Sequence, residues 1–396
     1  MKAILPKIKF KNFYEKWNRK KLQSIAPLRG GFAFKSEKFQ DSGIPIVRIS
    51  NIKFDGTVGG EFEYYSKINS DEKFVLRGRS ILLAVSGATT GKIAMLDSEE
   101  EYYQNQRVGY FQNTGAVNYD FLSSVLQTKE FTNQLNSVLV AGAQPNISSK
   151  EIDSFIFYIP ESLNEQSAIG SLFHTLDDLL SSYKDNLANY QSLKATMLSK
   201  MFPKAGQTVP EIRLDGFEGG WEEKEFIKIV NRVTESSDSD SLPKVEFEDI
   251  ISGQGKLNKD ISCKFDNRKG ILFKPGYTLY GKLRPYLNNW LLPKFEGVAL
   301  GDFWVFDPNG NNSDFIYYLV QSSRYQKVAN DTSGTKMPRS DWKSVSTTIF
   351  AIPQTIAEQQ VIGAYFSNLD NLINSHQEKI SQLETLKKKL LKDMFI

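Results

Sequence analysis

The sequence predicts an α+β protein built as an internal repeat. Two mixed α/β domains are expected to be separated by two long antiparallel coiled-coil helices related by a pseudo-twofold axis. The strongest observation is that residues 159–202 and 352–395 align without a gap at an offset of 193, with 16 of 44 positions identical. A gapless match of this length indicates a true duplication. A duplication folded about a twofold axis brings its two helices together in opposite directions.

Both copies carry apolar residues at alternating steps of four and three, the heptad of a coiled-coil seam. Each helix is expected to be roughly 50–60 Å long at 1.5 Å per residue. Lys194 and Lys387 interrupt the stripe at equivalent places, where the paired helices either meet a partner or let the lysine charges reach water from packed stems. The second alternative is favoured. The predicted seam residues are Ile169, Phe173, Leu176, Leu180 and Leu187 in the first helix, and Ile362, Phe366, Leu369, Ile373 and Ile380 in the second.

The duplication extends ahead of each variable region. Residues 6–22 parallel residues 210–226 at an offset of 204, with Trp17 matching Trp221. The variable regions contain short β-branched runs separated by turn residues, which indicates strands. Four segments are therefore expected: a first domain at 1–158, a helix at 159–203, a second domain at 204–351 and a helix at 352–396.

Each variable region is also expected to contain one amphipathic helix. In the first region this helix is predicted over residues 121–139, and its counterpart in the second region includes Phe315. The two variable regions differ from each other far more than the two long helices do. This contrast favours different targets for the two domains.

Composition and charge set broad limits on function. The 396 residues carry a net charge of +3, which permits an anionic partner without requiring one. The single cysteine, Cys263, excludes a disulfide framework and favours a reducing, cytoplasmic location. We expect no membrane segment, because no run of 18 apolar residues and no signal-peptide pattern is present.

Motifs for catalysis are missing. The nearest match to a phosphate-binding loop, Gly87 to Lys92, is one residue too short and is followed by Ile93 where Ser or Thr must hold magnesium. A strand–turn–strand is expected there instead. No glycine-rich dinucleotide fingerprint follows a strand. His174 and His376 lie in the predicted helices, where packing or solvation is expected. The sequence predicts a non-catalytic chain with no cofactor or metal of its own.

Polar and basic side chains in the predicted loops form a candidate DNA-binding set. Arg, Asn and Gln make paired hydrogen bonds to base edges, whereas Lys, Ser and Thr hold phosphates. Any one of these residues, taken alone, is more readily explained as an ordinary solvated loop position. The candidates in the first domain are Arg48, Asn51, Ser86, Thr89, Thr90, Lys92, Gln104, Gln106, Arg107, Gln144, Asn146 and Lys150. The candidates in the second domain are Lys282, Arg284, Tyr286, Asn288, Asn289, Thr335, Lys336, Arg339, Ser340 and Lys343.

Over the whole chain, the order of motifs resembles the specificity subunit of type I restriction-modification systems. The pattern P-x-I-x-F/L-x-x-F-x-x-x-W heads each variable region, and IP-x(4)-EQ-x-x-IG-x-x-F-x-x-LD opens each long helix. Glycine-led strands (GRSILL and GYTLY) and the segments GAQPNISSKEI and GTKMPRSDW lie between them in the same order. Each motif is loose alone, and their repetition in one order is specific.

The resemblance implies two target-recognition domains that each read one half of a split DNA site, with helices that set the gap. It implies two methyltransferase subunits that carry S-adenosylmethionine, and restriction subunits that hydrolyse ATP, translocate DNA and cut it. The expected partners are therefore double-stranded DNA and these subunits, which do the chemistry. Individual base contacts do not carry over from the family, so the candidate residues rest on residue type and loop placement.

Two other functional classes stay open. An enzyme with an unfamiliar active site is disfavoured by the missing cofactor motifs, and methyl transfer or cleavage by the chain alone would favour it. A scaffold would use its coiled coil to join proteins and its variable regions to bind protein or glycan. Failure of the assembled complex to shift DNA would favour that class.

Overall fold

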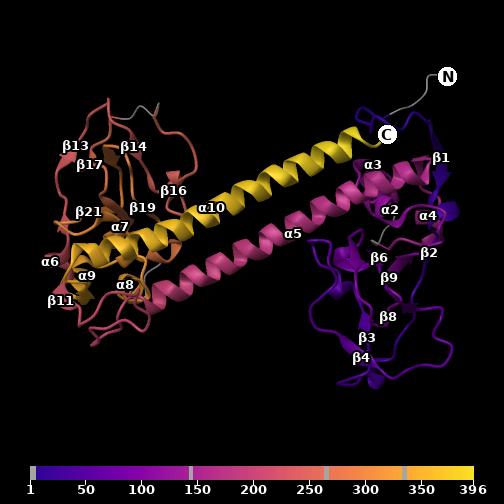
Figure 1. The fold of residues 1–396 in the computed structure, drawn as a ribbon, viewed down its shortest axis with the longest axis horizontal. Helices are drawn as coiled ribbons and strands as arrows, with labels where there is room; N and C mark the ends of the chain where they lie inside the picture. The colour runs from indigo at the N-terminus through magenta and orange to yellow at the C-terminus, as the bar shows by residue number, and fades with distance from the viewer. Residues whose placement is uncertain (1–5, 142–145, 263–266, 332–336) are drawn as a thin grey trace. The chain divides into compact units, whose positions relative to one another are not determined.

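The computed structural model describes residues 6–141, 146–262, 267–331 and 337–396. The chain forms two compact units, Met1–Tyr183 with Lys379–Ile396, and Lys184–Glu378. Each unit is an α+β domain packed on part of α5 (Leu163–Lys200) and part of α10 (Ile356–Asp393), as Figure 1 shows. Within the described residues, no helix is both long and apolar enough to cross a membrane.

The first unit contains two four-stranded sheets and a strand pair. Sheet order β2-β9-β6-β7 is antiparallel, and order β4-β3-β8-β5 has β3 parallel to β8. β1 pairs antiparallel with β10, with Trp17 opposite Pro160. Its elements are β1 (Trp17–Lys21), α1 (Leu22–Ile25), β2 (Leu28–Arg29), η1 (Ser36–Lys38), β3 (Ile44–Val47), η2 (Ile49–Asn51), β4 (Glu63–Tyr65), β5 (Val75–Leu76), β6 (Ser80–Ala84), η3 (Gly87–Thr89), β7 (Ile93–Leu96), β8 (Tyr102–Gln104), β9 (Val108–Phe111), α2 (Tyr119–Val125), α3 (Lys129–Ala141), α4 (Ser149–Asp153) and β10 (Ile156–Pro160).

The second unit has the same parts and one extra strand pair, β15–β16. Its elements are β11 (Glu222–Glu225), α6 (Phe226–Ile229), β12 (Asn231–Arg232), β13 (Ser236–Ser237), β14 (Lys244–Val245), η4 (Phe247–Asp249), β15 (Ile250–Ile251), β16 (Lys256–Leu257), β17 (Gly270–Phe273), β18 (Thr278–Gly281), η5 (Pro285–Leu287), β19 (Trp290–Leu291), β20 (Gly297–Ala299), β21 (Phe303–Asp307), α7 (Ser313–Leu319), α8 (Ser323–Ala329), α9 (Trp342–Thr347) and β22 (Ile349–Ile352).

The two units repeat one topology. The antiparallel order β12-β21-β18-β19 corresponds to β2-β9-β6-β7. In the mixed sheets, the parallel pair β14–β20 corresponds to β3–β8, and β17 corresponds to β5. The mixed sheets differ in their fourth strand, which lies beside β3 in the first unit and beside β17 in the second. The predicted internal repeat of two β-rich domains is confirmed.

A buried glutamate at the start of each long helix anchors the segment that opens its unit. Trp17 Nε1 donates to Glu165 Oε1 at 3.2 Å, and Trp221 Nε1 donates to Glu358 Oε1 at 3.0 Å. Arg213 adds an ion pair to Glu358 at 2.7 Å. Both carboxylates are almost fully buried. A buried carboxylate must find donors, so these bonds fix the opening segment on its helix.

The next residues of the motif join the helix to the domain core. Gln166 Oε1 accepts from Asn118 N at 2.8 Å, and Gln359 makes the same bond in the second unit. The Asn118 side chain also caps α2 by accepting from Phe121 N. A Cβ on Gly170 would lie 2.6 Å from Phe121 N, so only glycine lets the two helices approach this closely.

The single helix predicted over residues 121–139 is instead two helices, α2 and α3. Their junction lies at Thr128, whose Oγ1 accepts from Phe131 N at 3.3 Å and starts a new helix. Ser322 does the same between α7 and α8, where its hydroxyl accepts from Tyr325 N. The break lets α3 turn back onto the core, where Phe131 is buried.

Most predicted seam residues are buried, but not only against the partner helix. The N-terminal part of each stripe also packs into the core of its own domain, where Phe173 and Phe366 lie. The phenylalanine that ends the opposite helix joins each core: Phe395 meets Phe173 at 5.7 Å and Phe202 meets Phe366 at 6.0 Å between ring centroids. The buried seam residues are Ile169, Phe173, Leu176, Leu180, Ile362, Phe366, Leu369 and Ile373, whereas Leu187 and Ile380 are half-buried.

Contacts between the helices establish their direction. In the second unit, Lys194 of α5 contacts Asp370 of α10. Tyr190, four residues earlier on α5, contacts His376, which is six residues later on α10. Residue numbers therefore rise along α5 in the direction in which they fall along α10. The helices pack antiparallel, as the duplication predicts.

Candidate nucleic-acid interface

In the first unit, three loops that are distant in sequence meet at one end of the antiparallel sheet. Val85 N, just after β6, donates to Arg107 O at 3.1 Å, and Ile147 N donates to Val85 O at 2.9 Å. These backbone bonds hold the loops together whatever side chains they carry. We call this surface the first loop platform and define it as residues 85–92, 105–107 and 146–150.

The first loop platform encloses an open hollow of about 500 Å³ with polar side chains around it. Ser86, Gln106, Arg107 and Asn146 line the hollow, and the last three are exposed. Ser86 Oγ is buried without a hydrogen-bond partner among the described residues. Hydroxyl, amide and guanidinium groups in one concave surface suit a ligand rich in hydrogen-bonding edges.

A lysine and an exposed aromatic ring lie close together in this unit. Lys92 Nζ stands 2.7 Å from the centroid of the Phe54 ring, and Phe54 is 91% exposed. Desolvation lowers the pKa of the Lys92 ammonium. Phe54 was not among the sequence candidates. The sequence feature that could have identified Phe54 is its place in the turn from Lys53 to Gly56. An apolar ring in a surface turn is exposed, and an exposed apolar side chain can mark a binding surface.

The second unit builds the same platform with the same backbone bonds. Lys282 N, just after β18, donates to Asp302 O, and Ser340 N donates to Lys282 O, both at 2.9 Å. Lys282 thus takes the place of Val85. We define the second loop platform as residues 282–289, 301–302 and 337–343.

The side chains of the second loop platform are more strongly charged. Asp302 pairs with Arg339 at 3.0 Å and with Lys282 at 3.7 Å. The hydrogen bond to the Asp302 carboxylate raises the pKa of Arg339. The backbone at Arg284 and Asn288 is left-handed, with φ of 47° and 54°. These two turns bracket η5.

The turn through η5 projects two side chains outward. Tyr286 is 58% exposed, and Arg284 is exposed with no side-chain partner among the described residues. An exposed ring beside a free guanidinium can stack on a base and read its edge. Asp302 was not predicted, because an acidic residue is not an obvious member of an anion-binding surface. Its role here is to orient Arg339.

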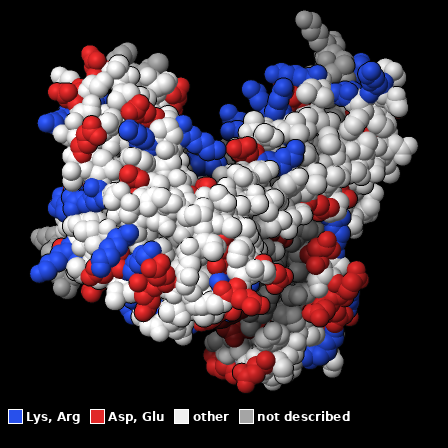
Figure 2. Space-filling view, turned by 60° about the vertical axis from the view of Figure 1, so that its left-hand side comes forward, with Lys and Arg blue, Asp and Glu red and all other residues white. Residues whose placement is uncertain are grey.

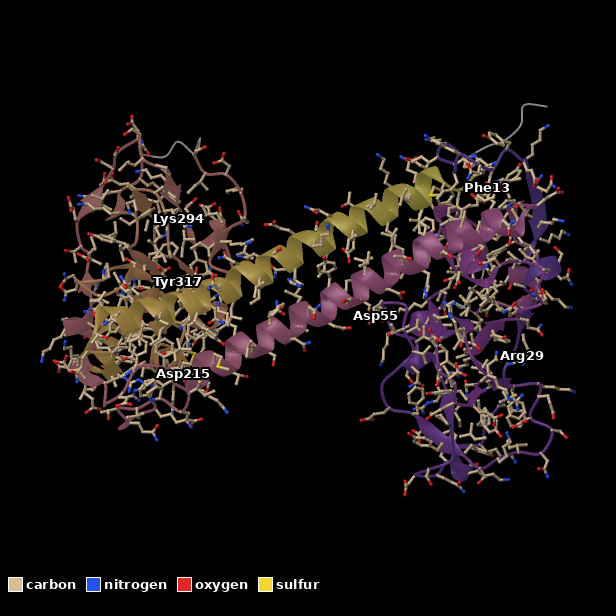
Figure 3. The ribbon with its side chains drawn as sticks, in the orientation of Figure 1. Phe13, Arg29, Asp55, Asp215, Lys294 and Tyr317 are labelled. Carbon is tan, nitrogen blue, oxygen red and sulfur yellow. The ribbon has the colours of Figure 1, made fainter. Side chains whose placement is uncertain are left out.

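Four predicted candidates are buried and used inside the fold. Asn51 donates to Gly59 O and Glu61 O, and Gln104 donates to Arg29 O and Val108 O. Buried amides need such partners, so these groups are not available to an external ligand. Arg29 itself, labelled in Figure 3, donates to Gln104 and to Val75 O. The four buried residues are Asn51, Gln104, Asn289 and Ser340.

The remaining candidates are distributed as follows. Arg48 pairs with Glu63 at 3.2 Å and directly follows Val47, whose carbonyl accepts from Asn105 N of the platform. Thr90 turns back to Gly87 O. Lys150 and Lys343 are exposed on α4 and α9. Thr89 and Asn288 are half-buried within their platforms. Gln144, Thr335 and Lys336 lie outside the described residues.

The segment that most resembles a phosphate-binding loop is a short connection between two strands. The segment from 85 to 92 joins β6 to β7 through the η3 turn, which confirms the predicted strand–turn–strand. Among residues 6–141, 146–262, 267–331 and 337–396, His, Cys, Asp and Glu side chains form no cluster fit to hold a metal ion.

The chain is similar in sequence to proteins of one known family. The family model for the type I restriction modification DNA specificity domain matches residues 14–189 and 265–385. The type I restriction enzyme MjaVIII specificity subunit of Methanocaldococcus jannaschii is 26% identical over 173 residues, 42% of this chain and 40% of that protein. The EcoAI specificity subunit of Escherichia coli is 30% identical over 175 residues, 42% of this chain and 30% of that protein. The chain thus spans less than half the length of these relatives.

Solved structures share the fold over nearly the whole chain. The crystal structure of a type I restriction-modification system S subunit from M. genitalium matches with a TM-score of 0.63 at 16% identity, covering 99% of both chains. A structure concerned with assembly and conformational transition of the type I R-M system matches with a TM-score of 0.51 at 14% identity, covering 96% of this chain and 97% of that one. At such identities the likeness is one of fold.

Proposed function

Because the chain belongs to the type I restriction modification DNA specificity family, we propose that its two loop platforms read DNA sequence for a type I restriction-modification complex. Each platform reads one half of a bipartite, asymmetric site. The helices α5 and α10 set the spacing between the halves and dock two methyltransferase subunits. S-adenosylmethionine and ATP belong to the partner subunits, and this chain has no catalytic role of its own.

One observation supports this division of work above the others. Both platforms are held by the same backbone bonds, Val85 to Arg107 in one and Lys282 to Asp302 in the other, yet they display different side chains. A shared scaffold with unlike surface groups suits two readers of unlike sequences. The first platform displays Gln106 and Arg107, whereas the second displays Arg284 and Tyr286. Because these side chains differ, we expect the two half-sites to differ in sequence.

A domain exchange tests the division directly. Residues 1–158 are replaced by the corresponding region of another family member, and the chain is assembled with its methyltransferase subunits. Methylated adenines are then mapped by long-read sequencing. One half of the methylated sequence is expected to change and the other to stay. A change in both halves would refute separate reading.

Point variants sharpen the assignment to the platforms. Arg284→Ala removes an exposed guanidinium, and Lys274→Ala removes an exposed cation of the same unit outside the platform. A lost base contact typically costs about 1–3 kcal/mol, so methylation of the wild-type site should fall roughly 5- to 150-fold for Arg284→Ala alone. Equal effects of the two variants would count against base reading by the platform.

The spacing role is tested by shortening both helices together. Deleting residues 184–190 and 377–383 removes one heptad from each helix and leaves the register of Asp177 with Lys387 and of Lys194 with Asp370 unchanged. Seven residues span about 10 Å of helix, close to three base pairs of duplex. The methylated halves should keep their sequences while their spacer shortens by about three base pairs. An unchanged spacer would exclude the helices as the measure of distance.

A further inference from the structure

The segments that open the two units share their anchors. In the first unit Ile8 N donates to Asp393 O at 2.9 Å, near the end of α10, and Trp17 bonds to its buried glutamate. In the second unit, Ile212 N donates to Lys200 O at 3.1 Å, at the end of α5. Trp221 donates to the buried Glu358, as Trp17 does to Glu165. We call residues 6–21 the basic segment and residues 210–225 the acidic segment.

The exposed positions of these segments carry opposite charges. The basic segment holds seven Lys and Arg and one Glu, whereas the acidic segment holds six Asp and Glu and two Lys or Arg. Phe13 marks the basic segment and Asp215 the acidic segment in Figure 3. The reversals at equivalent positions are Lys7 to Glu211, Lys11 to Asp215, Arg19 to Glu223 and Lys21 to Glu225.

The cations of the basic segment are free to meet a ligand. Within the described residues, ion pairs are formed in this segment only by Lys7 with Asp393, at 3.9 Å, and by Lys9 with Glu165. The last turns of α10 add more exposed lysines to the same unit. Figure 2 shows Lys and Arg side chains gathered at the upper right of the view, on the first unit. The exposed cations for which the described part of the chain supplies no ion-pair partner are Lys11, Lys16, Arg19, Lys20, Lys21, Lys388, Lys389 and Lys392.

The acidic segment is not a matching free surface. Glu211 pairs with Lys204, Glu222 with Lys224 at 2.8 Å, and Glu225 with Lys228 at 3.0 Å. Half of its carboxylates are therefore neutralised within the chain. The acidic segment of a second copy therefore offers the basic segment few free anions, whereas duplex DNA carries one charge per ~1.7 Å.

We propose that the basic segment, with the end of α10, binds the phosphate backbone of duplex DNA without regard to sequence. Two equivalent surfaces of opposite charge cannot hold the same partner surface, so this contact belongs to one side of the repeat only. The inference rests on the proposed function in that DNA is the polyanion. It adds a contact that positions the duplex rather than reading it.

The test uses the full chain and a fluorescent duplex of arbitrary sequence. Lys11→Asp and Arg19→Glu are combined, because the acidic segment shows that this fold accepts Asp215 and Glu223 at the equivalent positions. The matched control is Lys35→Asp with Lys38→Glu, which changes the charge equally at exposed positions of the same unit. Fluorescence anisotropy gives the Kd over a range of salt concentrations.

The double variant is expected to bind at least roughly tenfold more weakly, with a slope of log K against log salt smaller by about two. The control should match the wild type. Equal losses in both variants, or no DNA binding by the wild-type chain, would overturn the inference. So would salt-sensitive self-association of the wild type, seen by sedimentation and abolished in the double variant, with unchanged DNA binding. The mapped methylation pattern tests sequence reading separately, so either idea can fail without the other.

Discussion

Lys194 Nζ on α5 donates to Asp370 Oδ1 on α10 at 2.6 Å. The duplication creates the equivalent contact in the first unit, where Lys387 on α10 donates to Asp177 on α5. Adding the repeat offset of 193 to Lys194 gives Lys387, and adding it to Asp177 gives Asp370. Both lysines were expected to snorkel into water. They are instead ion-paired across the helices, so a polar pair replaces the apolar stripe at these positions. We expect this pair to favour the antiparallel register.

Removing one partner of this pair should destabilise the second unit. The Lys194 and Asp370 side chains are only 13% and 22% exposed. Lys194→Ala leaves a partly buried carboxylate without its cation, which we expect to cost about 1–3 kcal/mol. Urea unfolding measures the loss. In the double variant Lys194→Ala with Asp370→Ala, part of the stability should return.

The control for this prediction is Lys379→Ala, which removes an exposed lysine of α10 that forms no ion pair with any residue the structure describes. Its effect should stay within about 0.5 kcal/mol. If Lys194→Ala were equally mild, the pair would be an ordinary surface contact and would not specify register.

The two buried glutamates should differ in importance. Glu358 receives Trp221 and two guanidinium bonds from Arg213, at 2.7 and 2.8 Å. Glu165 accepts from Trp17 and has Lys9 at 3.5 Å, while its Oε2 finds no hydrogen-bond partner in the described parts of the chain. Glu358→Ala is therefore expected to cost about 3–5 kcal/mol, more than Glu165→Ala.

Differential scanning calorimetry of both variants checks this order. The conservative variants Glu358→Gln and Glu165→Gln keep an acceptor for the tryptophan and serve as controls. Because the bidentate pair with Arg213 needs a carboxylate, Glu358→Gln should still lose stability, while Glu165→Gln should be the milder change. The reverse order would contradict the role assigned to Arg213.

The glycines of the helix motif are required by close approach. A Cβ on Gly363 would lie 2.7 Å from Asp314 Cβ and 3.1 Å from Phe315 N. Gly363→Ala forces the helices apart, for which overpacking values of about 1–3 kcal/mol apply. Gly30→Ala is the control, since nothing lies within 4 Å of an added Cβ there. Thermal unfolding separates them, and similar Tm values for both would refute the packing argument.

Sequence patterns predicted the repeat, the long helices and the strand-rich domains because these features recur at fixed spacing. The break at Thr128 was also encoded, as a hydroxyl residue ahead of a new apolar period, but the continuous apolar pattern of 121–139 obscured it. The apolar stripe of each long helix was predicted to pack only against the stripe of the other helix. Residues such as Phe173 show that one stripe serves both a partner helix and a domain core.

The loop residues were harder to judge from sequence. Asn51 and Gln106 are both polar residues of predicted loops, yet one is buried and the other exposed. The difference depends on whether a backbone carbonyl from elsewhere reaches the amide, and residue type does not reveal this. The convergence of three loops likewise depends on sheet order. Val85 and Arg107 meet because β6 and β9 are neighbours in the sheet.

Alkaline pH should expose the role of Tyr318, whose hydroxyl donates to Asp370 Oδ2 at 2.8 Å. Burial, followed by the charge of Asp370, raises the pKa of Tyr318. A raised folded-state pKa contributes stability in full below the unfolded pKa near 10, and this contribution is lost as pH rises through the folded value. Tyr318→Phe lacks the contribution at every pH.

Urea unfolding at about pH 8 and about pH 10.5 tests this dependence. At the lower pH, Tyr318→Phe should be less stable than the wild type by about 1.5–3 kcal/mol, the value for a hydrogen bond to a charged group. At the higher pH the difference should shrink, because the wild-type tyrosine is then penalised by the ionised unfolded state. Tyr14→Phe, at a side chain 85% exposed, should show no difference at either pH. If Tyr318→Phe were as stable as the wild type at the lower pH, the Tyr318 hydroxyl would contribute nothing and Asp370 would be held by Lys194 alone.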